Sequence, residues 1–531
     1  MALFIGEERH TASTPWGTLV GCLFASTMCG FFYSFSVYSG ALKAQFGMTQ
    51  SQVESINTLP YLLGPLSFIP GIFVQRVGPR RVLALGGSMV SLTACCQWAV
   101  ARRVLAVPVQ SVPLVLTFLA MLTYAGMQCV TSVVFPLPAQ HFPHHRGAMV
   151  GIAKCFVGLA AGIILQAYVT ITGRQPDSSD ATVDFILFYA ILSVAVTLAA
   201  SATVRAAPRE AKFGASSQSV RLRVRAIIAL ILGIIVLMAV VSVAPIGMAA
   251  HRLIVVFVLG LCLALALLPL DWPCLPGDVP VETSASDGQQ VDVSSAAAET
   301  ASRATPATAA ATRAAATAAA SPTDSPAAAA SDLREPLDFA ASVTRRHELA
   351  DLDAVETIQT LNCWLLLLSS TAVIGGGAML TTNLNQIVVA VQSGSDGALV
   401  SSAVTLFSCS QSLSRLAVST ISDSVLRRGY AVPRPLFVTL VATFMGIGHL
   451  LFFVAGANSS STYLLMGCCL CGVGFGGVWP LMVVISSELF GSRRLSQNYM
   501  IFDGTGGAVG NVVLANLLPS VVYSRAPHFG Q

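Results

Sequence analysis

The chain has 531 residues, of which 54% are hydrophobic and only 10% are charged, and its formal net charge is +4. A soluble domain carries about 25% charged residues, so this composition excludes a soluble globular protein and indicates a polytopic membrane protein. No run of Lys and Arg interleaved with aromatic residues occurs in the sequence, which argues against a nucleic-acid partner.

The N-terminal segment predicts a membrane span and no cleavable signal peptide. Residues 1–15 are polar and are expected to form a cytosolic tail. The apolar run that begins at Trp16 is about 24 residues long, whereas the apolar part of a signal peptide has about 7–15 residues. A run of this length matches a transmembrane helix of about 20 residues, with the lipid bilayer as partner.

Thirteen apolar runs follow one another along the chain. Each must be a helix if it crosses lipid, because lipid satisfies no backbone polar groups. The predicted fold is therefore all-α, a polytopic transmembrane helical bundle with about thirteen spans. The predicted spans are 16–40, 53–75, 82–101, 111–134, 148–171, 184–204, 226–247, 252–270, 361–388, 398–420, 435–455, 463–487 and 500–523.

One long segment, 271–359, interrupts this pattern. Its central part is rich in Ala, Ser, Thr and Pro and lacks the bulky apolar residues that form a core, so the sequence predicts a disordered cytosolic loop. Twelve of the thirteen cysteines lie within apolar runs, where thiols behave as small hydrophobic groups, and these are expected to pack rather than form disulfides.

Basic residues set the predicted orientation. Arg76, Arg80 and Arg81 crowd the short turn between the second and third spans. With the N-terminus in the cytosol, roughly three quarters of all Lys and Arg fall on the cytosolic side, as the positive-inside rule requires. The expected location is the plasma membrane, with an organelle membrane as the alternative.

An internal repeat appears when the sequence is shifted by 348 residues. Gly71 and Gln75 then fall on Ser419 and Asp423, and Phe142-x3-Arg146 falls on Phe490-x3-Arg494. Repeats of this kind are typical of transporters built from two halves. The predicted organisation is a six-helix half, 16–205, two additional helices, 226–270, a second half, 360–523, and a tail, 524–531.

These motifs resemble a known family. The stretch GIFVQRVGPRR from Gly71 resembles the loop motif of the major facilitator superfamily, and Arg146-Gly147-x3-Gly151 resembles a second motif of that superfamily. Further matches point to its nodulin-like branch, as in a protist-type member. They include Phe35-Ser36-x-Tyr38-Ser39, Trp364-Leu-Leu-Leu, Asn383-Leu-Asn-Gln386, Ser414-Arg415, Ser422-Asp423, Pro433-Arg-Pro-Leu436, Trp479-Pro-Leu-Met482 and Ser487-Glu-Leu-Phe-Gly491.

The resemblance implies a rocker-switch transporter for a small organic anion. Relatives in parasitic protists suggest iron or another transition metal as the alternative substrate, and a non-transporting nutrient sensor is the alternative outside transport. The family pattern of six, two and six spans predicts fourteen, whereas the second half here has five. The last helix is therefore expected to be missing, through truncation or as a genuine variant.

Polar residues inside the spans are candidates for the substrate cavity. Placing them in lipid is energetically unfavourable, so their presence in a span indicates a functional role. Lys154 lies roughly 10 Å into its span and binds either an anion or a partner acid, or else extends to the interface. The amides and hydroxyls line a cavity or hydrogen-bond between helices. The candidates are Tyr33, Ser34, Tyr38, Tyr124, Gln128, Lys154, Asn383, Asn385, Gln386 and Gln411.

A second group is expected to gate the cavity. Asp503 is the only carboxylate clearly inside a predicted span; it couples protons or pairs with Arg415 or the Arg76 loop to join the halves. Arg415, at the end of its span, is alternatively an interface anchor. Gln75 stands where the superfamily motif has Asp, while Asp423 keeps the acid in the other half. The gating candidates are Gly71, Gln75, Arg76, Gly78, Arg80, Arg81, Arg146, Arg415, Asp423 and Asp503.

The sequence favours neither an enzyme nor a resident cofactor or metal. No catalytic triad or phosphate-binding loop occurs, and the glycines from Gly472 to Gly477 lie inside an apolar span, where they permit close helix packing. His141, His144 and His145 would suit a metal, but no Cys or carboxylate completes a site. The expected partners are a small-molecule or ion substrate and the bilayer, with the protein a monomer.

Overall fold

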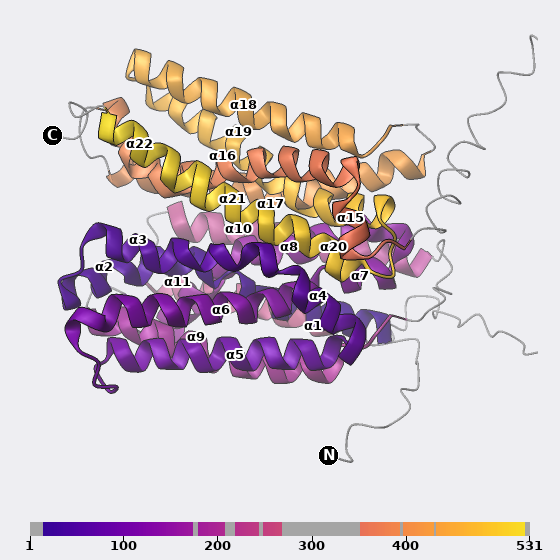
Figure 1. Ribbon diagram of the computed structural model, residues 1–531, viewed down its shortest axis with the longest axis horizontal. Helices are drawn as coiled ribbons and strands as arrows, with labels where there is room; N and C mark the ends of the chain where they lie inside the picture. Colours follow the sequence, from indigo (N-terminus) through magenta and orange to yellow (C-terminus); the bar gives the residue numbers. More distant parts are fainter. Residues whose placement is uncertain are drawn as a thin grey trace, which may run out of the picture. The chain divides into compact units, whose positions relative to one another are not determined.

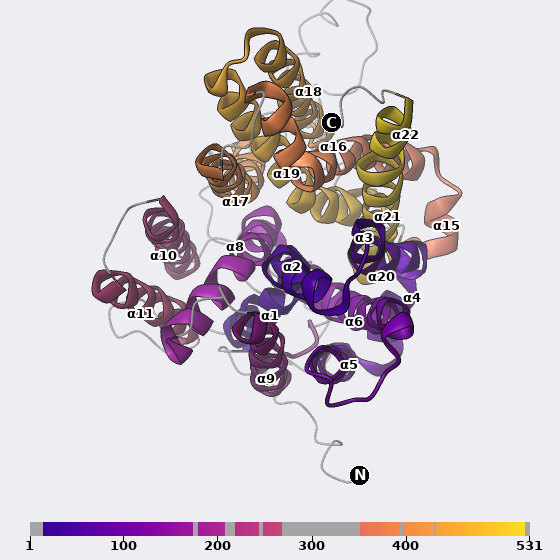
Figure 2. The ribbon, with the colours of Figure 1, turned by 90° about the vertical axis from the view of Figure 1, so that its left-hand side faces the viewer.

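The computed structural model describes residues 14–173, 179–207, 218–243, 248–267, 351–392, 397–428 and 432–525. These residues are almost entirely helical and include no strand, so the all-α prediction is confirmed. The helices run side by side in Figure 1 and are seen nearly end on in Figure 2. The predicted disordered loop lies outside the described residues up to residue 350.

Residues 14–207 contain the helices of the predicted first half. In chain order these are α1 (Thr14–Cys29), α2 (Phe35–Phe46), α3 (Gln50–Thr58), α4 (Phe68–Val77), α5 (Pro79–Ala101), α6 (Val112–Val134), α7 (Pro136–His141), α8 (Arg146–Thr172) and α9 (Ser179–Thr203). The two additional helices are α10 (Gln218–Val243) and α11 (Met248–Ala264).

The described part of the second half begins with a short helix before its long ones. The elements are α15 (Ala354–Ile358), α16 (Leu361–Gln392), α17 (Gly397–Arg427), α18 (Pro435–Asn458), α19 (Ser461–Leu489), α20 (Leu495–Ile501), α21 (Gly507–Val509) and α22 (Leu518–Arg525). In Figure 2 the helices of the first half and those of the second form two groups, with α8, α2 and α3 where the groups meet.

The first two predicted spans are broken. The first turns at Gly30, passes through a short 3-10 helix and continues as α2 beyond its predicted end at residue 40. In the second, Pro60 and Pro65 lie in the 3-10 stretch Leu59–Leu66, and the chain bends by 55° before α4. Proline removes a backbone donor and clashes with the preceding turn, so this span does not remain straight.

The predicted number of thirteen spans is not confirmed. Among the described residues, nine helices are long and apolar enough to cross a membrane, and the bent pair in residues 51–77 would make ten. Helices also occupy the remaining predicted spans, but α1 has 16 residues, α11 has 17, and α17 carries several polar residues over its 31. Length and hydropathy therefore miss helices whose polar side packs against protein.

Close packing of α19 shows why that helix is rich in glycine. A Cβ atom on Gly472 would lie 2.8 Å from the carbonyl oxygen of Phe407 in α17, and one on Gly474 would lie 2.8 Å from that of Val441 in α18. Contacts this short are not tolerated, so both neighbours approach only because the side chain is absent. The predicted packing role of these glycines is confirmed.

The last described helix changes its winding twice. Between α20 and α21 the residues Phe502–Gly506 are π-helical, and Gly510–Leu517 are π-helical again before α22. Such π segments are rare in proteins overall, but those that occur are often found at functional sites. They redirect side chains relative to a regular α-helix. Asp503, Asn511 and Asn516 all lie in these two segments.

Candidate functional site

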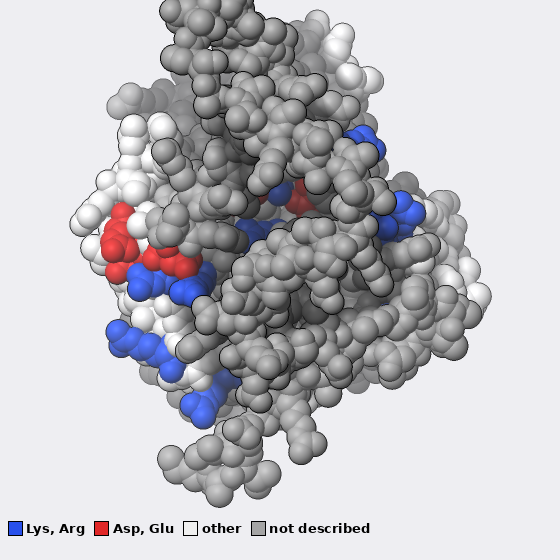
Figure 3. Space-filling model, turned by 90° about the vertical axis from the view of Figure 1, so that its right-hand side faces the viewer, with Lys and Arg blue, Asp and Glu red and all other residues white. Residues whose placement is uncertain are grey.

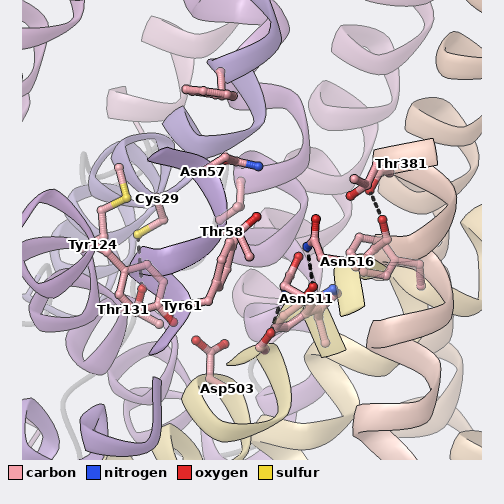
Figure 4. A pocket seen from close by; sticks show the side chains of 18 of the residues that line it. Cys29, Asn57, Thr58, Tyr61, Tyr124, Thr131, Thr381, Asp503, Asn511 and Asn516 are labelled. Atoms are coloured by element: carbon pink, nitrogen blue, oxygen red, sulfur yellow. Dashed lines mark hydrogen bonds between the residues drawn. The ribbon is translucent and has the colours of Figure 1, made fainter. Parts of the chain in front are cut away.

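A cavity of about 490 Å³ lies between the helices of the two halves. Figure 4 shows Asn57, Thr58 and Tyr61 from the first half facing Asn511 and Asn516 from the second. The other residues that line it include Cys29, Ser39, Glu54, Tyr124, Gln128, Thr131, Phe135, Lys154, Thr381, Thr382, Gln386, Arg415, Phe475, Trp479 and Asp503.

Lys154 and Asp503 join the two halves at this cavity. The Nζ atom of Lys154 on α8 donates to Oδ1 of Asp503 at 3.0 Å and to the hydroxyl of Tyr499 at 2.5 Å. Tyr499 also contacts Asp503 directly. Only 6% of the lysine side chain and 11% of the aspartate side chain are exposed, so this ion pair is buried.

Aromatic rings surround the lysine. Its Nζ atom lies 3.9 Å from the ring centroid of Phe135, 4.8 Å from that of Trp479 and 5.2 Å from that of Tyr499. An ammonium group over aromatic faces gains cation–π attraction, about 2 kcal/mol where it is desolvated. These rings stabilise a charge that burial would otherwise disfavour.

Arg415 is the second cation that lines the cavity. Its side chain is buried, at 1% exposure, in the middle of α17. Nη1 donates to the carbonyl oxygen of Lys154 at 2.8 Å, and Nη2 donates to Oε1 of Gln411 at 3.0 Å. Among the described residues no Asp or Glu forms an ion pair with Arg415, and its Nε atom has no hydrogen-bond partner there.

These contacts change two predictions. Asp503 was expected to couple protons or to pair with Arg415 or the Arg76 loop, and its ion-pair partner is Lys154, for which a partner acid was one of the predicted alternatives. Arg415 was placed at the end of a span closing at residue 420, but α17 continues to Arg427. Ser419 and Asp423, further along α17, are 1% and 3% exposed because they pack against α8.

The predicted cavity residues divide into two sets. Tyr124, Gln128, Lys154 and Gln386 line the cavity, and Nε2 of Gln128 donates to the Tyr124 hydroxyl at 2.6 Å. Ser34, Tyr38, Asn383 and Gln411 are not among the described residues that line it. Ser34 is buried, the ring of Tyr38 packs on Phe31 and Phe35, Nδ2 of Asn383 donates to two backbone carbonyls, and Gln411 accepts from Arg415. The side chains of Tyr33 and Asn385 lie outside the described part.

Sequence reasoning missed several polar residues of the cavity. Asn57, Thr58 and Tyr61 lie where the second span breaks, next to the prolines that signal this break. Asn511 and Asn516 lie in the second π segment, which no sequence pattern announces. The two asparagines and Asp503 are the strongly polar residues of the last predicted span. Three such residues in one span could have indicated that this helix lines the cavity.

At one end of the helices the two halves touch closely. We call this the closed end and define it by Gly71, Gly147, Asp423 and Gln497. A Cβ on Gly71 of α4 would lie 2.5 Å from the Cα atom of Gln497 in α20, and one on Gly147 of α8 would lie 2.6 Å from Oδ1 of Asp423 in α17. The shift of 348 residues places α4 on α17 and α8 on α20. The contact between α4 and α20 and the contact between α17 and α8 are therefore equivalent in the two halves.

Asp423 caps a helix of the opposite half. Its Oδ2 atom accepts from the backbone N–H of Ala148 at 2.9 Å, in the first turn of α8. Its Oδ1 atom accepts from Nη2 of Arg434 at 2.8 Å, and Arg434 also pairs with Glu488 at 2.5 Å. A carboxylate at a helix N-terminus satisfies an unpaired donor and the positive end of the dipole. Gln75, the counterpart in the repeat, is exposed.

The other gating candidates lie around the closed end. Gly78 has a φ of 89° and precedes α5, whose first turn holds Arg80 and Arg81. Arg76 is exposed at the end of α4, and Arg146 is the first residue of α8. Their gating roles remain predictions.

A short segment before α16 binds the same end. Asp351 pairs with Arg493 at 3.5 Å, and Asp353 pairs with Arg494 at 3.6 Å. Nδ2 of Asn498 donates to the carbonyl oxygen of Leu352 at 2.9 Å. Figure 3 views the end where α4, α15 and α20 lie in Figure 1 and shows acidic and basic side chains in contact. The segment thus holds the turn that leads into α20.

The fold is that of the major facilitator superfamily. The E. coli proton:xylose symporter XylE, bound to 6-bromo-6-deoxy-D-glucose, is similar at a TM-score of 0.54 and 11% identity, over 98% of this chain and 92% of that one. The E. coli fucose:proton symporter FucP is similar at a TM-score of 0.46 and 12% identity, over 97% and 93%. At 11% identity, the likeness to XylE shows the fold alone.

Residues 15–274 match the sequence model of the nodulin-like family. The motifs that suggested this branch lie largely in residues 364–491, outside the matched range, and the predicted resemblance to this family is confirmed for the first half of the chain. Protein NUCLEAR FUSION DEFECTIVE 4 of Arabidopsis thaliana is 24% identical over 186 residues, which cover 35% of this chain and 30% of that protein. The match therefore spans less than a third of that relative's length.

Proposed function

We propose that the chain carries a small organic anion across a membrane by alternating access, with Arg415 as the group that binds the anion's carboxylate. The single observation that carries this proposal is a buried guanidinium on the cavity wall, 1% exposed, for which the described residues supply no acid. A buried charge without a counter-ion costs several kcal/mol, which a bound carboxylate offsets.

Arginine has the donor geometry that this role needs. A guanidinium has five N–H donors, and the described contacts of Arg415 use two of them, to Lys154 and Gln411. Both acceptors are neutral, so the positive charge is hydrogen-bonded but not neutralised. A planar carboxylate can accept two parallel hydrogen bonds from such a group, which gives orientation as well as affinity.

The charges around the cavity favour an anion. Two cations, Lys154 and Arg415, and two acids, Asp503 and Glu54, line it. Asp503 is occupied by Lys154, and Glu54 is exposed on α3. The three charged residues that are not exposed, Lys154, Arg415 and Asp503, thus sum to one positive charge. The amides Asn57, Gln128, Gln386, Asn511 and Asn516 supply neutral donors and acceptors for the rest of a small polar solute.

The contacts between the halves support a switching role for Lys154 and the closed end. In alternating access one half rocks against the other around a central site. Opening the closed end would require α8 to leave α17 and α4 to leave α20, which breaks the Lys154–Asp503 pair and the cap from Asp423 to Ala148. We place this end in the cytosol, because the basic turns of the positive-inside assignment lie there.

Uptake into proteoliposomes tests this function. Labelled small monocarboxylates and dicarboxylates, a neutral sugar, an amino acid and ferrous iron are offered to the wild type, Arg415→Gln and Arg415→Lys. We expect carboxylate uptake by the wild type, loss of at least about tenfold in Arg415→Gln, and partial recovery in Arg415→Lys, since charge returns without the planar donor pair. Asp184→Asn, which removes an acid outside the cavity, is the control.

Other outcomes decide against the proposal. Uptake of the sugar alone, or carboxylate uptake that is indifferent to Arg415, would refute the anion site. Iron uptake would revive the transition-metal alternative, although among the described residues no three His, Cys, Asp or Glu side chains lie close enough to hold a metal ion. No flux of any solute, with saturable binding retained, would favour the sensor.

A further inference from the structure

A second hollow lies on the outside of the first half, between α5 and α9. Its volume is about 1160 Å³, and it shares no residue with the cavity between the halves. Ser91, Ala190 and Thr197 line it and are only 4–7% exposed, so they form its floor. Leu92, at 66% exposure, and Leu198, at 67%, stand at its edges. The hollow is therefore an apolar groove that faces the lipid.

Two arginines close one end of this groove. Arg80 and Arg81 line it in the first turn of α5, next to Gly78 and Pro79. No Asp or Glu occurs among the described residues that line the groove. Among the described residues no side chain caps the N-terminus of α5, so the positive end of the helix dipole lies at the same end of the groove as the two arginines. This end attracts a negative charge, whereas the rest of the groove accommodates hydrocarbon.

The length of the groove matches one leaflet of a bilayer. It follows α5 from Arg81 to Cys95, which is about 21 Å at 1.5 Å per residue. Half of the hydrocarbon core of a bilayer is about 15 Å thick. A groove that starts at the arginines therefore runs from the headgroup level to about the bilayer midplane.

We propose that this groove is a binding site for an anionic glycerophospholipid. The phosphate and acidic headgroup contact Arg80 and Arg81, and an acyl chain lies in the groove between α5 and α9. The occupant is a lipid, because the charged end and the apolar trough are continuous and the trough opens toward the membrane. A free phosphate would use only the two arginines, and an uncharged lipid would use only the trough.

The site also adjoins the closed end. Val77, the last residue of α4, and Gly78 line the groove. The same helix holds Gly71, which packs against Gln497 of the other half. A lipid bound at the start of α5 therefore contacts the element that moves when the closed end opens, and its binding is expected to favour the conformation described above.

Native mass spectrometry of the purified full chain tests the proposal. Detergent-solubilised protein is titrated with phosphatidylserine or phosphatidylcholine of the same acyl composition, and with inorganic phosphate. Three variants are compared with the wild type: the double variant Arg80→Gln/Arg81→Gln, the groove-filling variant Ser88→Trp, and the double variant Arg221→Gln/Arg225→Gln. The last pair is exposed on α10, outside the groove, and controls for the loss of two positive charges.

We expect phosphatidylserine to bind more tightly than phosphatidylcholine. Each arginine near a headgroup contributes about fivefold, so Arg80→Gln/Arg81→Gln should weaken phosphatidylserine binding about 25-fold. Ser88→Trp keeps both arginines and should also weaken binding, because the acyl chain loses its place. The α10 double variant should bind as the wild type does. Thermal unfolding without added lipid verifies that each variant is folded.

Three results would overturn the proposal. Equal binding of phosphatidylserine and phosphatidylcholine would show that the negative charge of the headgroup plays no part in binding. If the α10 double variant loses as much phosphatidylserine affinity as Arg80→Gln/Arg81→Gln does, the effect comes from the overall charge of the protein and not from this site. Competition by inorganic phosphate at comparable affinity, with Ser88→Trp unaffected, would leave a simple anion site with no lipid.

Discussion

Replacing Asp503 by Asn removes the acid of the buried pair and leaves Lys154 inside the protein without a counter-ion. The two charged groups are 3.0 Å apart and are 6% and 11% exposed. Breaking a buried pair by removing one partner costs about 3–5 kcal/mol, since the remaining charge stays desolvated. The rings around Nζ compensate in part, so we expect a loss of about 3 kcal/mol in the free energy of unfolding.

The double variant Lys154→Gln/Asp503→Asn makes the prediction sharper. With both charges gone, no uncompensated ion remains. The double variant is therefore expected to be more stable than either single variant by about 2 kcal/mol. Asp184→Asn is the matched control. It breaks a pair with Arg102 at 2.8 Å whose side chains are 27% and 20% exposed, and it should cost about 1 kcal/mol or less.

Unfolding in detergent can be followed with a thiol-reactive fluorophore. The free cysteines Cys22, Cys155, Cys468 and Cys471 are buried and become reactive when the helices separate. Denaturant titration of the wild type, Lys154→Gln, Asp503→Asn and the double variant then gives the coupling between the two charges, with Asp184→Asn measured alongside. If Asp503→Asn costs no more than Asp184→Asn, or if the double variant loses the sum of the single losses, Lys154 and Asp503 do not act as a buried pair.

Three further perturbations test the closed end and the segment that binds it. Gly71→Ala places a methyl group 2.5 Å from the Gln497 backbone and should destabilise by about 1–3 kcal/mol, while Gly446→Ala, which meets nothing within 4 Å, should be neutral or stabilising in the same unfolding assay. Asp423→Asn removes the charge at the start of α8 and should increase labelling of a cysteine introduced at the closed end, whereas substitution of the exposed Gln75 should not. Asp353→Ala removes the cap of α15 and should raise hydrogen exchange in residues 351–360 at a cost of about 1 kcal/mol; unchanged exchange would contradict its capping role.

The sequence was sufficient for the fold class but not for the partners within the site. The apolar runs predicted helices where the structure describes them, and the depth of Lys154 followed from its distance along the helix. Its partner Asp503 is 349 positions away, and no pattern within a span indicates which helix packs against which. Only the repeat of 348 residues hinted that the start of α8 and the start of α20 are equivalent places.

The largest error concerned Arg415 and has a physical cause. A stretch with Ser, Arg and Asp lowers hydropathy in the same way whether it leaves the membrane or faces another helix. Ser414, Ser419 and Asp423 are buried against protein, so what looked like the end of a span is the interface between halves. The π segments that turn Asn511 and Asn516 toward the cavity were likewise not predictable, because they arise from tertiary packing of a glycine-rich helix.

The most direct test of the account compares binding of an acid with binding of its amide. The best carboxylate from the uptake panel and the neutral amide of the same skeleton are titrated into the wild type and Arg415→Gln. Loss of a hydrogen bond to a charged group is worth about 10–100-fold, so the wild type should prefer the acid by that factor. The preference should vanish in Arg415→Gln. An unchanged preference in the variant would contradict the assignment of Arg415 as the anion-binding group.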